Sequence, residues 1–193
     1  TMTDMNANTD TWPRPHRLTV EEYYRMAEVG LLAHDARVEL IEGEIIDMAP
    51  IGSRHAEVVD RLGKRLHAAT GEVATVGVQR PVRLDSRSEP QPDLVLLKPR
   101  SYANAHPTPR DVLLLIEVSD STLRFDRDTK VALYARHGIA EVWLVDLVTP
   151  ALHVFRHPSN NHYRDVTRID APGRIQVTAL PGIAVDLTGL FEF

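Results

Sequence analysis

Two carboxylates and one amine in this sequence occupy positions that suit chemistry assisted by a metal ion. Glu117 lies near the end of the aliphatic run of residues 112–119, and Asp93 opens a second aliphatic run directly after Pro92. Lys130 follows in a segment with a helical pattern. An ionised carboxylate at the end of a buried strand is costly unless a cation or a metal ion neutralises it. Carboxylate oxygens of this kind suit hard divalent cations such as Mg²⁺ or Mn²⁺.

The run of residues 112–119 is expected to form a central strand of a sheet. Alternation of side chains along a strand places Val112 and Leu114 on one face, and Leu113 and Glu117 on the other. Both faces are apolar before Glu117, as in strands that are covered on both sides. Glu117 is therefore predicted to lie at the carboxyl end of a buried strand.

Asp93 and Glu117 meet if their two strands are antiparallel neighbours. Two carboxylates about 4 Å apart repel by roughly 4 kcal/mol at an effective dielectric constant of about 20. A shared proton, a lysine or arginine side chain, or a divalent metal ion must offset this repulsion. Lys130 is the best nearby cation, because the helix predicted to carry it immediately follows. We expect it to neutralise both carboxylates.

A helix predicted over residues 126–138 positions this lysine. Asp126, Lys130 and Tyr134 are spaced four residues apart, so they share one face of the helix. Gly138 is a normal residue to end it. If the helix packs back over the sheet, the long stem of Lys130 can reach the end of the strand.

The same residues also have ordinary structural interpretations. Asp93 after Pro92 suits a turn, and Asp126 with Lys130 suits an exposed ion pair worth a few tenths of a kcal/mol. Tyr134 suits a core position. It is the conjunction of these residues, rather than any one of them, that favours a functional site.

The remaining pattern predicts an α+β or mixed α/β protein with helices covering a central sheet. Helices are predicted over residues 18–28, with Thr19 as N-cap, and over residues 53–70, with Ser53 as N-cap. Alternation around Glu42-Gly43 predicts two short strands within residues 37–50. Further strands are predicted over residues 73–79, 81–85, 93–98, 112–119 and 140–147, followed by a hairpin of residues 151–156 and 162–169.

Composition limits the class of protein. The chain has 193 residues, 43% of them hydrophobic, and no cysteine, which excludes disulfides and thiolate chemistry. No apolar run approaches the roughly 20 residues that span a bilayer. We expect a cytoplasmic protein with a disordered tail over residues 1–16, which lack a signal-like apolar stretch, and one domain over residues 17–193. The net charge of −5 does not favour long-range attraction to a polyanion.

Residues 117–146 resemble the Uma-type family of putative restriction endonucleases, within the PD-(D/E)XK nuclease superfamily. The run EVSDSTLRFDRDTKVALYARHGIAEVWLVD is similar to that family's E-V-x-S-x-S-T, D-R-x-x-K, Y-A-x-x-G-I and V-D segments. ELIEGEI at residues 39–45 and His55 also match. Position 119, where the superfamily pattern has lysine, is Ser119. In the Uma-type branch the lysine is carried by the following helix, as Lys130 is here.

The resemblance implies a restriction-endonuclease-like mixed sheet flanked by helices, with additional β-hairpins. It implies that Asp93 and Glu117, with the Val118 carbonyl, hold Mg²⁺ or Mn²⁺, and that Lys130 takes the place of the motif lysine. Glu39 resembles the additional acidic residue of many superfamily members. The implied activity is hydrolysis of phosphodiester bonds in DNA by a homodimer.

Four other side chains are expected to position the catalytic groups or the substrate. They are His55, Ser119, Asp126 and Tyr134. A histidine in the first turn of an apolar-faced helix is more often structural, so the role of His55 stays open.

The sequence leaves two rival functions open. A nuclease-like fold can bind DNA or a protein without cleavage, and a toxin–antitoxin-like interaction module needs only ordinary hydrogen bonds at Asp93 and Glu117. Two basic groups either contact phosphates or form solvated faces. One comprises Arg80, Arg83 and Arg87, and the other comprises Arg54, Arg61, Lys64 and Arg65.

Overall fold

A six-stranded mixed sheet forms the centre of the computed structural model, which describes residues 12–193. The strand order is β3-β4-β5-β6-β7-β8, in which β5 and β6 are parallel and the other neighbours are antiparallel. The predicted α+β architecture is therefore confirmed. The strands of this sheet are β3 (Thr75–Val78), β4 (Leu94–Leu97), β5 (Val112–Ser119), β6 (Glu141–Asp146), β7 (Ala151–Ser159) and β8 (His162–Ile169).

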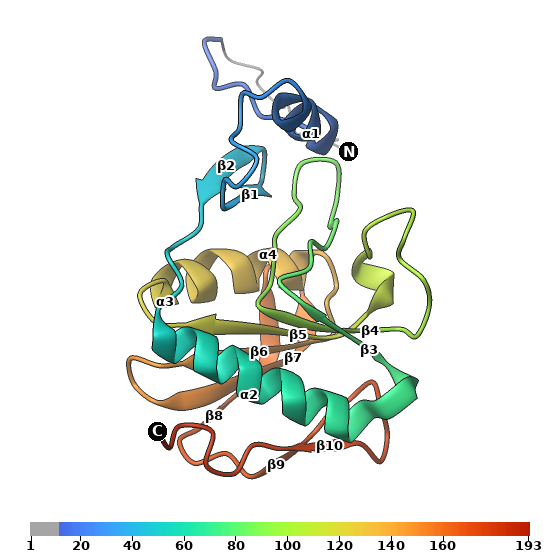
Figure 1. The fold of residues 1–193 in the computed structure, drawn as a ribbon, viewed down its shortest axis with the longest axis vertical. Helices are drawn as coiled ribbons and strands as arrows, with labels where there is room; N and C mark the ends of the chain where they lie inside the picture. The colour runs from blue at the N-terminus through green and yellow to red at the C-terminus, as the bar shows by residue number, and fades with distance from the viewer. Residues whose placement is uncertain (1–11) are drawn as a thin grey trace, which may run out of the picture.

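Helices cover both faces of the sheet (Figure 1). The helix α2 (Ser53–Thr70) packs Leu62 and Leu66 into one apolar core, which includes Ile116 of β5. On the other face, α3 (Leu123–Phe125), a π-helical turn (Asp126–Lys130) and α4 (Val131–Arg136) run continuously. The α4 residue Leu133 belongs to a second core with Leu115 of β5. The two cores exist because successive side chains of a central strand point to opposite faces.

A smaller lobe stands on this body (Figure 1). We call it the N-terminal lobe; it comprises α1 (Val20–Glu28), the hairpin of β1 (Val38–Ile41) and β2 (Glu44–Asp47), and the loop of residues 79–92. Thr19 is the N-cap of α1, as predicted. Its side chain accepts the backbone N–H of Glu22, and the Glu22 side chain accepts the backbone N–H of Thr19. The predicted turn at Glu42-Gly43 is also confirmed, and both residues have positive φ. A Cβ at Gly43 would lie 2.7 Å from the Cβ of Arg17, so glycine is required there.

One predicted strand is wrong. Residues 81–85 belong to the loop of the N-terminal lobe rather than to the sheet. The chain leaves the sheet at Gln79, which has positive φ. The two arms of the loop are then joined by backbone hydrogen bonds, from the N–H of Val82 to the carbonyl of Pro90 and from the N–H of Leu84 to the carbonyl of Ser88. Pro81 has no N–H to give to a sheet ladder.

Three details of the predicted elements also differ. The helix predicted from residue 126 begins at Leu123, and Gly52 rather than Ser53 is the N-cap of α2. Val112 lies on the face of Leu115, and Leu113 lies on the face of Leu114, which is the reverse of the prediction. The cause is an irregularity in the register between β4 and β5 just before Leu114. A two-stranded sheet of β9 (Arg174–Gln176) and β10 (Ala184–Asp186) was not predicted.

Part of the predicted N-terminal tail, residues 1–11, lies outside the described residues. Residues 12–16 precede α1 without helix or strand structure. Within residues 12–193, no helix combines the length and the apolar character needed to cross a membrane.

Candidate active site

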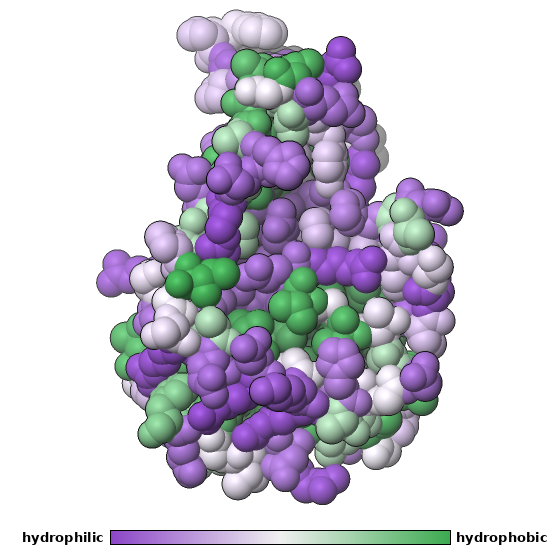
Figure 2. Space-filling view, viewed as in Figure 1, coloured by the Kyte–Doolittle hydropathy of each residue, from purple (hydrophilic) through white to green (hydrophobic). Residues whose placement is uncertain are grey.

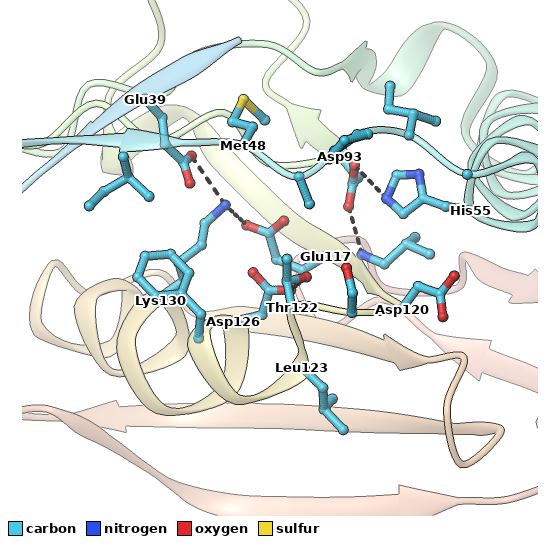
Figure 3. A pocket seen from close by; sticks show the side chains of 18 of the residues that line it. Glu39, Met48, His55, Asp93, Glu117, Asp120, Thr122, Leu123, Asp126 and Lys130 are labelled. Carbon is cyan, nitrogen blue, oxygen red and sulfur yellow. Dashed lines mark hydrogen bonds and ion pairs between the residues drawn. The ribbon is translucent and has the colours of Figure 1, made fainter.

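The sheet brings Asp93 and Glu117 to the same edge of one cavity. β4 and β5 are antiparallel, with Leu94 opposite Ile116, so the next position along this register places Asp93 beside Glu117. Both side chains line a cavity of about 940 Å³ between the N-terminal lobe and the body (Figure 3). The antiparallel arrangement on which the sequence argument depended is therefore present.

Lys130 enters this cavity from the π-helical turn. Its Nζ lies 2.8 Å from Oε1 of Glu117 and 3.2 Å from Oε2 of Glu39 (Figure 3). The side chains of Lys130, Glu117 and Glu39 are each only 4% exposed. Asp126 and Lys130 are both buried, so they are not the exposed ion pair of the ordinary interpretation. Glu39 comes from β1, and its Oε2 also accepts the backbone N–H of Gln91 at 2.9 Å.

Hydrogen bonds from the neighbouring elements hold the other carboxylates. The hydroxyl of Tyr134 donates to Oε1 of Glu117 at 2.5 Å. Asp126 accepts from the hydroxyl of Ser119 at 2.6 Å and from that of Thr122 at 2.5 Å. The β5 strand, the loop after it and the following helix thus form one network around the cavity floor.

Asp93 has different partners from those expected. Its Oδ1 lies 3.1 Å from Nε2 of His55, and its Oδ2 accepts the backbone N–H of Val118 at 2.8 Å (Figure 3). Lys130 contacts Glu117 and Glu39 but makes no ion pair with Asp93. The expectation that Lys130 neutralises Asp93 is therefore wrong. The reason is that His55, in the first turn of α2, pairs with this carboxylate. Lys130 pairs instead with Glu117 and with Glu39 of the N-terminal lobe.

The cavity floor carries an excess of negative charge. Burial raises the pKa of Glu117 to about 8; Lys130 lowers this pKa, while the carboxylates of Asp126, Asp93 and Glu39 raise it further. Burial also raises the pKa of Asp126. Burial alone would lower the pKa of Lys130, but the charges of Glu117 and Glu39 outweigh it and raise the pKa. The lysine is therefore firmly protonated, and its charge does not balance all the acids around it.

The hydrogen bond to Asp93 raises the pKa of His55 above its ordinary value, although burial opposes the shift. The other ring nitrogen of His55, Nδ1, is buried without a hydrogen-bond partner. His55 thus has Asp93 as the partner that fixes its orientation. The geometry pairs the two residues that the sequence separated by 38 positions.

The donor set fits a hard divalent cation. Glu117 and Asp93 offer carboxylate oxygens beside the backbone of Val118. A dication would favour the ionised form of Glu117, whose pKa is raised first by burial and then by the neighbouring carboxylates. Within residues 12–193, no group of three or more acidic or histidine side chains forms a complete metal cage. Mg²⁺ does not need such a cage, because it keeps several waters and binds through one or two carboxylates.

Several residues of the cavity were not identified from the sequence. Thr122 bonds to Asp126, and Asp120 lines the cavity beside Val118. Both follow Glu117 within five residues, so their closeness in sequence to this candidate metal ligand could have identified them as residues of the site. Gln91 acts through its backbone N–H, which leaves no trace in the residue type.

The two basic groups of the sequence contact the protein's own surface. On α2, Arg61 and Arg65 donate to backbone carbonyls of Glu192 and Asp186 in the C-terminal segment. In the other group, Arg83 pairs with Glu21 of α1. These contacts favour a structural role over phosphate binding for these three arginines.

Comparison with known proteins agrees with the fold. The chain is similar to the crystal structure of a putative nuclease belonging to DUF820 from Anabaena variabilis, with a TM-score of 0.69 and 17% sequence identity. The match covers 90% of this chain and 97% of that one. At this identity the similarity concerns the fold alone. No protein with a curated description matches the chain.

The family pattern covers most of the chain. The pattern of the Uma2 family, described as "Putative restriction endonuclease", matches residues 20–188. This range includes β1 with Glu39, the β4–β5 pair and the helix that carries Lys130. The chain therefore belongs to the Uma2 family of putative restriction endonucleases.

Proposed function

We propose that this protein is a divalent-metal-dependent endonuclease that hydrolyses phosphodiester bonds in DNA, and that its site is of the PD-(D/E)XK type. The observation that carries the proposal is the convergence of Asp93, Glu117 and Lys130 on one cavity, with Lys130 2.8 Å from Glu117. Membership of the Uma2 family adds support.

In this proposal Asp93, Glu117 and the Val118 carbonyl hold Mg²⁺ or Mn²⁺. The bound ion would lower the pKa of a water and polarise the phosphate. Glu117 must give up its proton to act as a ligand, because its pKa of about 8 leaves it largely protonated at neutral pH. The protein supplies the orientation of both carboxylates through the pairing of β4 and β5.

Lys130 has a defined part in this scheme. Because its pKa is raised, it acts as a fixed positive charge rather than as a base. From its position beside Glu117 it stabilises negative charge that develops on the phosphate, or orients the attacking water. Glu39 and Tyr134 hold Lys130 and Glu117 in place. Asp126 and Ser119 fix the start of the helix, and His55 fixes Asp93.

A cleavage assay tests the proposal directly. Plasmid, linear duplex DNA, single-stranded DNA and RNA are incubated with Mn²⁺ and either the native protein or Lys130→Ala. We expect cleavage of DNA by the native protein and its loss in Lys130→Ala. Lys98→Ala is the matched control, because Lys98 is exposed, lies outside the cavity and belongs to neither basic group. Equal cleavage by Lys130→Ala and the native protein would contradict the proposal, and binding of DNA without cleavage would favour a non-catalytic module.

The predicted homodimer and cytoplasmic location remain predictions. Size-exclusion chromatography with light scattering measures the oligomeric state directly. A dimer would suit cleavage of both strands of a duplex, since each strand needs a site.

A further inference from the structure

The walls above the acidic floor are apolar. One wall is formed by the end of β2 and the segment that follows it, and the other by the start of the helix after β5 and the turn after β6. Figure 2 shows apolar side chains among polar ones where the N-terminal lobe meets the body. The apolar side chains that line the cavity include Ile46, Met48, Ile51, Leu123, Phe125 and Val148.

Two of these side chains are exposed to solvent. Ile51 is 44% exposed and Val148 is 61% exposed, and one comes from each wall. An apolar opening with a polar rim marks a binding site for an apolar group. The cavity volume of about 940 Å³ lies in the range of small-molecule and nucleotide sites.

The reactive groups lie below these walls. The side chains of Glu117 and Lys130 are each 4% exposed, so a phosphate must enter the cavity to reach them. In a duplex the bases on both sides of a phosphate are paired and stacked, which keeps the backbone on a wide, stiff rod. A single strand is flexible enough for one phosphate to enter the cavity. The base of that nucleotide is unpaired and unstacked there, so an apolar surface beside it would replace its stacking contacts.

The positive charge around the opening is small. Of the described lysine and arginine side chains, those that line the cavity are Lys130 on the floor, Arg37 on one wall and Arg124 on the other. Both arginines are exposed. Nη1 of Arg37 donates to the backbone carbonyl of Ala49 at 2.9 Å, which leaves its Nε and Nη2 groups for a phosphate. Duplex binding gains most of its affinity by neutralising many phosphates. Two arginines suit the one or two phosphates that flank an inserted nucleotide.

We propose that the cavity admits one nucleotide of single-stranded DNA. The base lies against the apolar walls near Ile51 and Val148, and its phosphate reaches Glu117 and Lys130. Arg37 and Arg124 contact the neighbouring phosphates. This inference rests on the proposed nuclease function, and it adds that single-stranded DNA is the substrate.

Binding without metal separates this inference from catalysis. A fluorescein-labelled DNA single strand of about 12 nucleotides and the duplex of the same sequence are titrated with the full chain in EDTA, by fluorescence anisotropy. We expect the single strand to bind about tenfold more tightly than the duplex. Ile51→Asp should weaken single-strand binding by about tenfold, because it replaces an apolar contact with the base by a carboxylate. The control is Val166→Asp, which changes an exposed valine on β8 outside the cavity and should bind as the native protein does.

The outcomes distinguish the two proposals. Tighter binding of the duplex, or unchanged single-strand binding by Ile51→Asp, would overturn the inference while leaving the nuclease proposal intact. Tighter binding of an RNA strand of the same sequence would overturn the choice of DNA. If Mn²⁺ then gives no cleavage of either substrate, the nuclease proposal fails, whereas the preference for single strands is still decided by the titrations.

Discussion

Glu117 and Glu141 are both buried glutamates, and they lie on the neighbouring parallel strands β5 and β6. Glu141 is enclosed by donors: the Trp143 indole and the Arg156 guanidinium donate to its Oε1, and the backbone N–H of Thr178 donates to its Oε2 at 2.8 Å. All of these partners are hydrogen-bond donors, and Arg156 is also its ion-pair partner. This is the arrangement that lets a charge be buried for the sake of the fold.

Glu117 has a different environment. Lys130 and Tyr134 bond to its Oε1. Its pKa is raised chiefly by burial; Lys130 lowers this pKa, and the like charges of Asp126, Asp93 and Glu39 raise it further. A fold optimised only for stability would not gather these acids at one point. The comparison teaches that burial alone does not distinguish the two carboxylates, whereas the like charges gathered around Glu117 do, and such a grouping is the pattern expected at functional sites.

The largest expected difference between the two glutamates is in cleavage. Glu117→Gln removes a proposed metal ligand, and a bound metal ion contributes several kcal/mol to transition-state stabilisation. We expect the rate of DNA cleavage with Mn²⁺ to fall by about 10³-fold, measured by single-turnover assay. Glu141→Gln should retain most of the activity at a temperature where it is folded. Comparable losses in both variants would remove the distinction.

Folding stability should show the reverse order. Glu141→Gln leaves Arg156 without its ionic partner, and we expect the free energy of unfolding in urea at pH 6 to fall by about 3 kcal/mol. Glu117→Gln should cost less than about 1 kcal/mol, because Glu117 with a pKa of about 8 is already neutral at pH 6. The comparison would break if Glu117→Gln were the less stable of the two.

The pH dependence of stability sharpens the contrast. Because the pKa of Glu117 is raised from 4.5 to about 8 in the folded protein, the folded state holds a proton that the unfolded state releases between these values. Its contribution to stability is complete below pH 4.5 and is lost as the pH rises to 8. In EDTA, native protein should therefore lose about 2 kcal/mol between pH 6 and pH 8 relative to Glu117→Gln. Parallel curves for the two proteins would show that Glu117 has no raised pKa.

The smallest expected effect is that of metal on the melting temperature. At ten times its dissociation constant, Mg²⁺ should stabilise the native protein by about 1.4 kcal/mol, a rise of roughly 3–6 °C in differential scanning fluorimetry. Asp93→Asn and Glu117→Gln should abolish this rise. Glu141→Gln should melt at a lower temperature but respond to Mg²⁺ as the native protein does. A response that survives in Glu117→Gln would place the ion elsewhere.

Much of the fold was predictable from local patterns. The N-cap of α1 at Thr19 and the β1–β2 turn at Glu42-Gly43 follow from residue types within a few positions of each other. The loop conformation of residues 81–85 was not predictable, because their pattern is that of a strand. Their backbone N–H groups instead donate to Pro90 and Ser88 of the same loop and to Pro107. The register irregularity before Leu114 also depends on how two strands meet, and it exchanged the faces of Val112 and Leu113.

By itself, the sequence placed Asp93 and Glu117 at the ends of two aliphatic strands and Lys130 on the helix that follows, since these positions depend on short-range periodicity. Only the tertiary structure decided the partners of each group: Glu39 for Lys130, 91 residues away, and His55 for Asp93. It also decided that the acids lie beneath apolar walls built from two distant segments. The physical reason is that charge balance and burial depend on neighbours in space, and local patterns carry no record of which distant segments become neighbours.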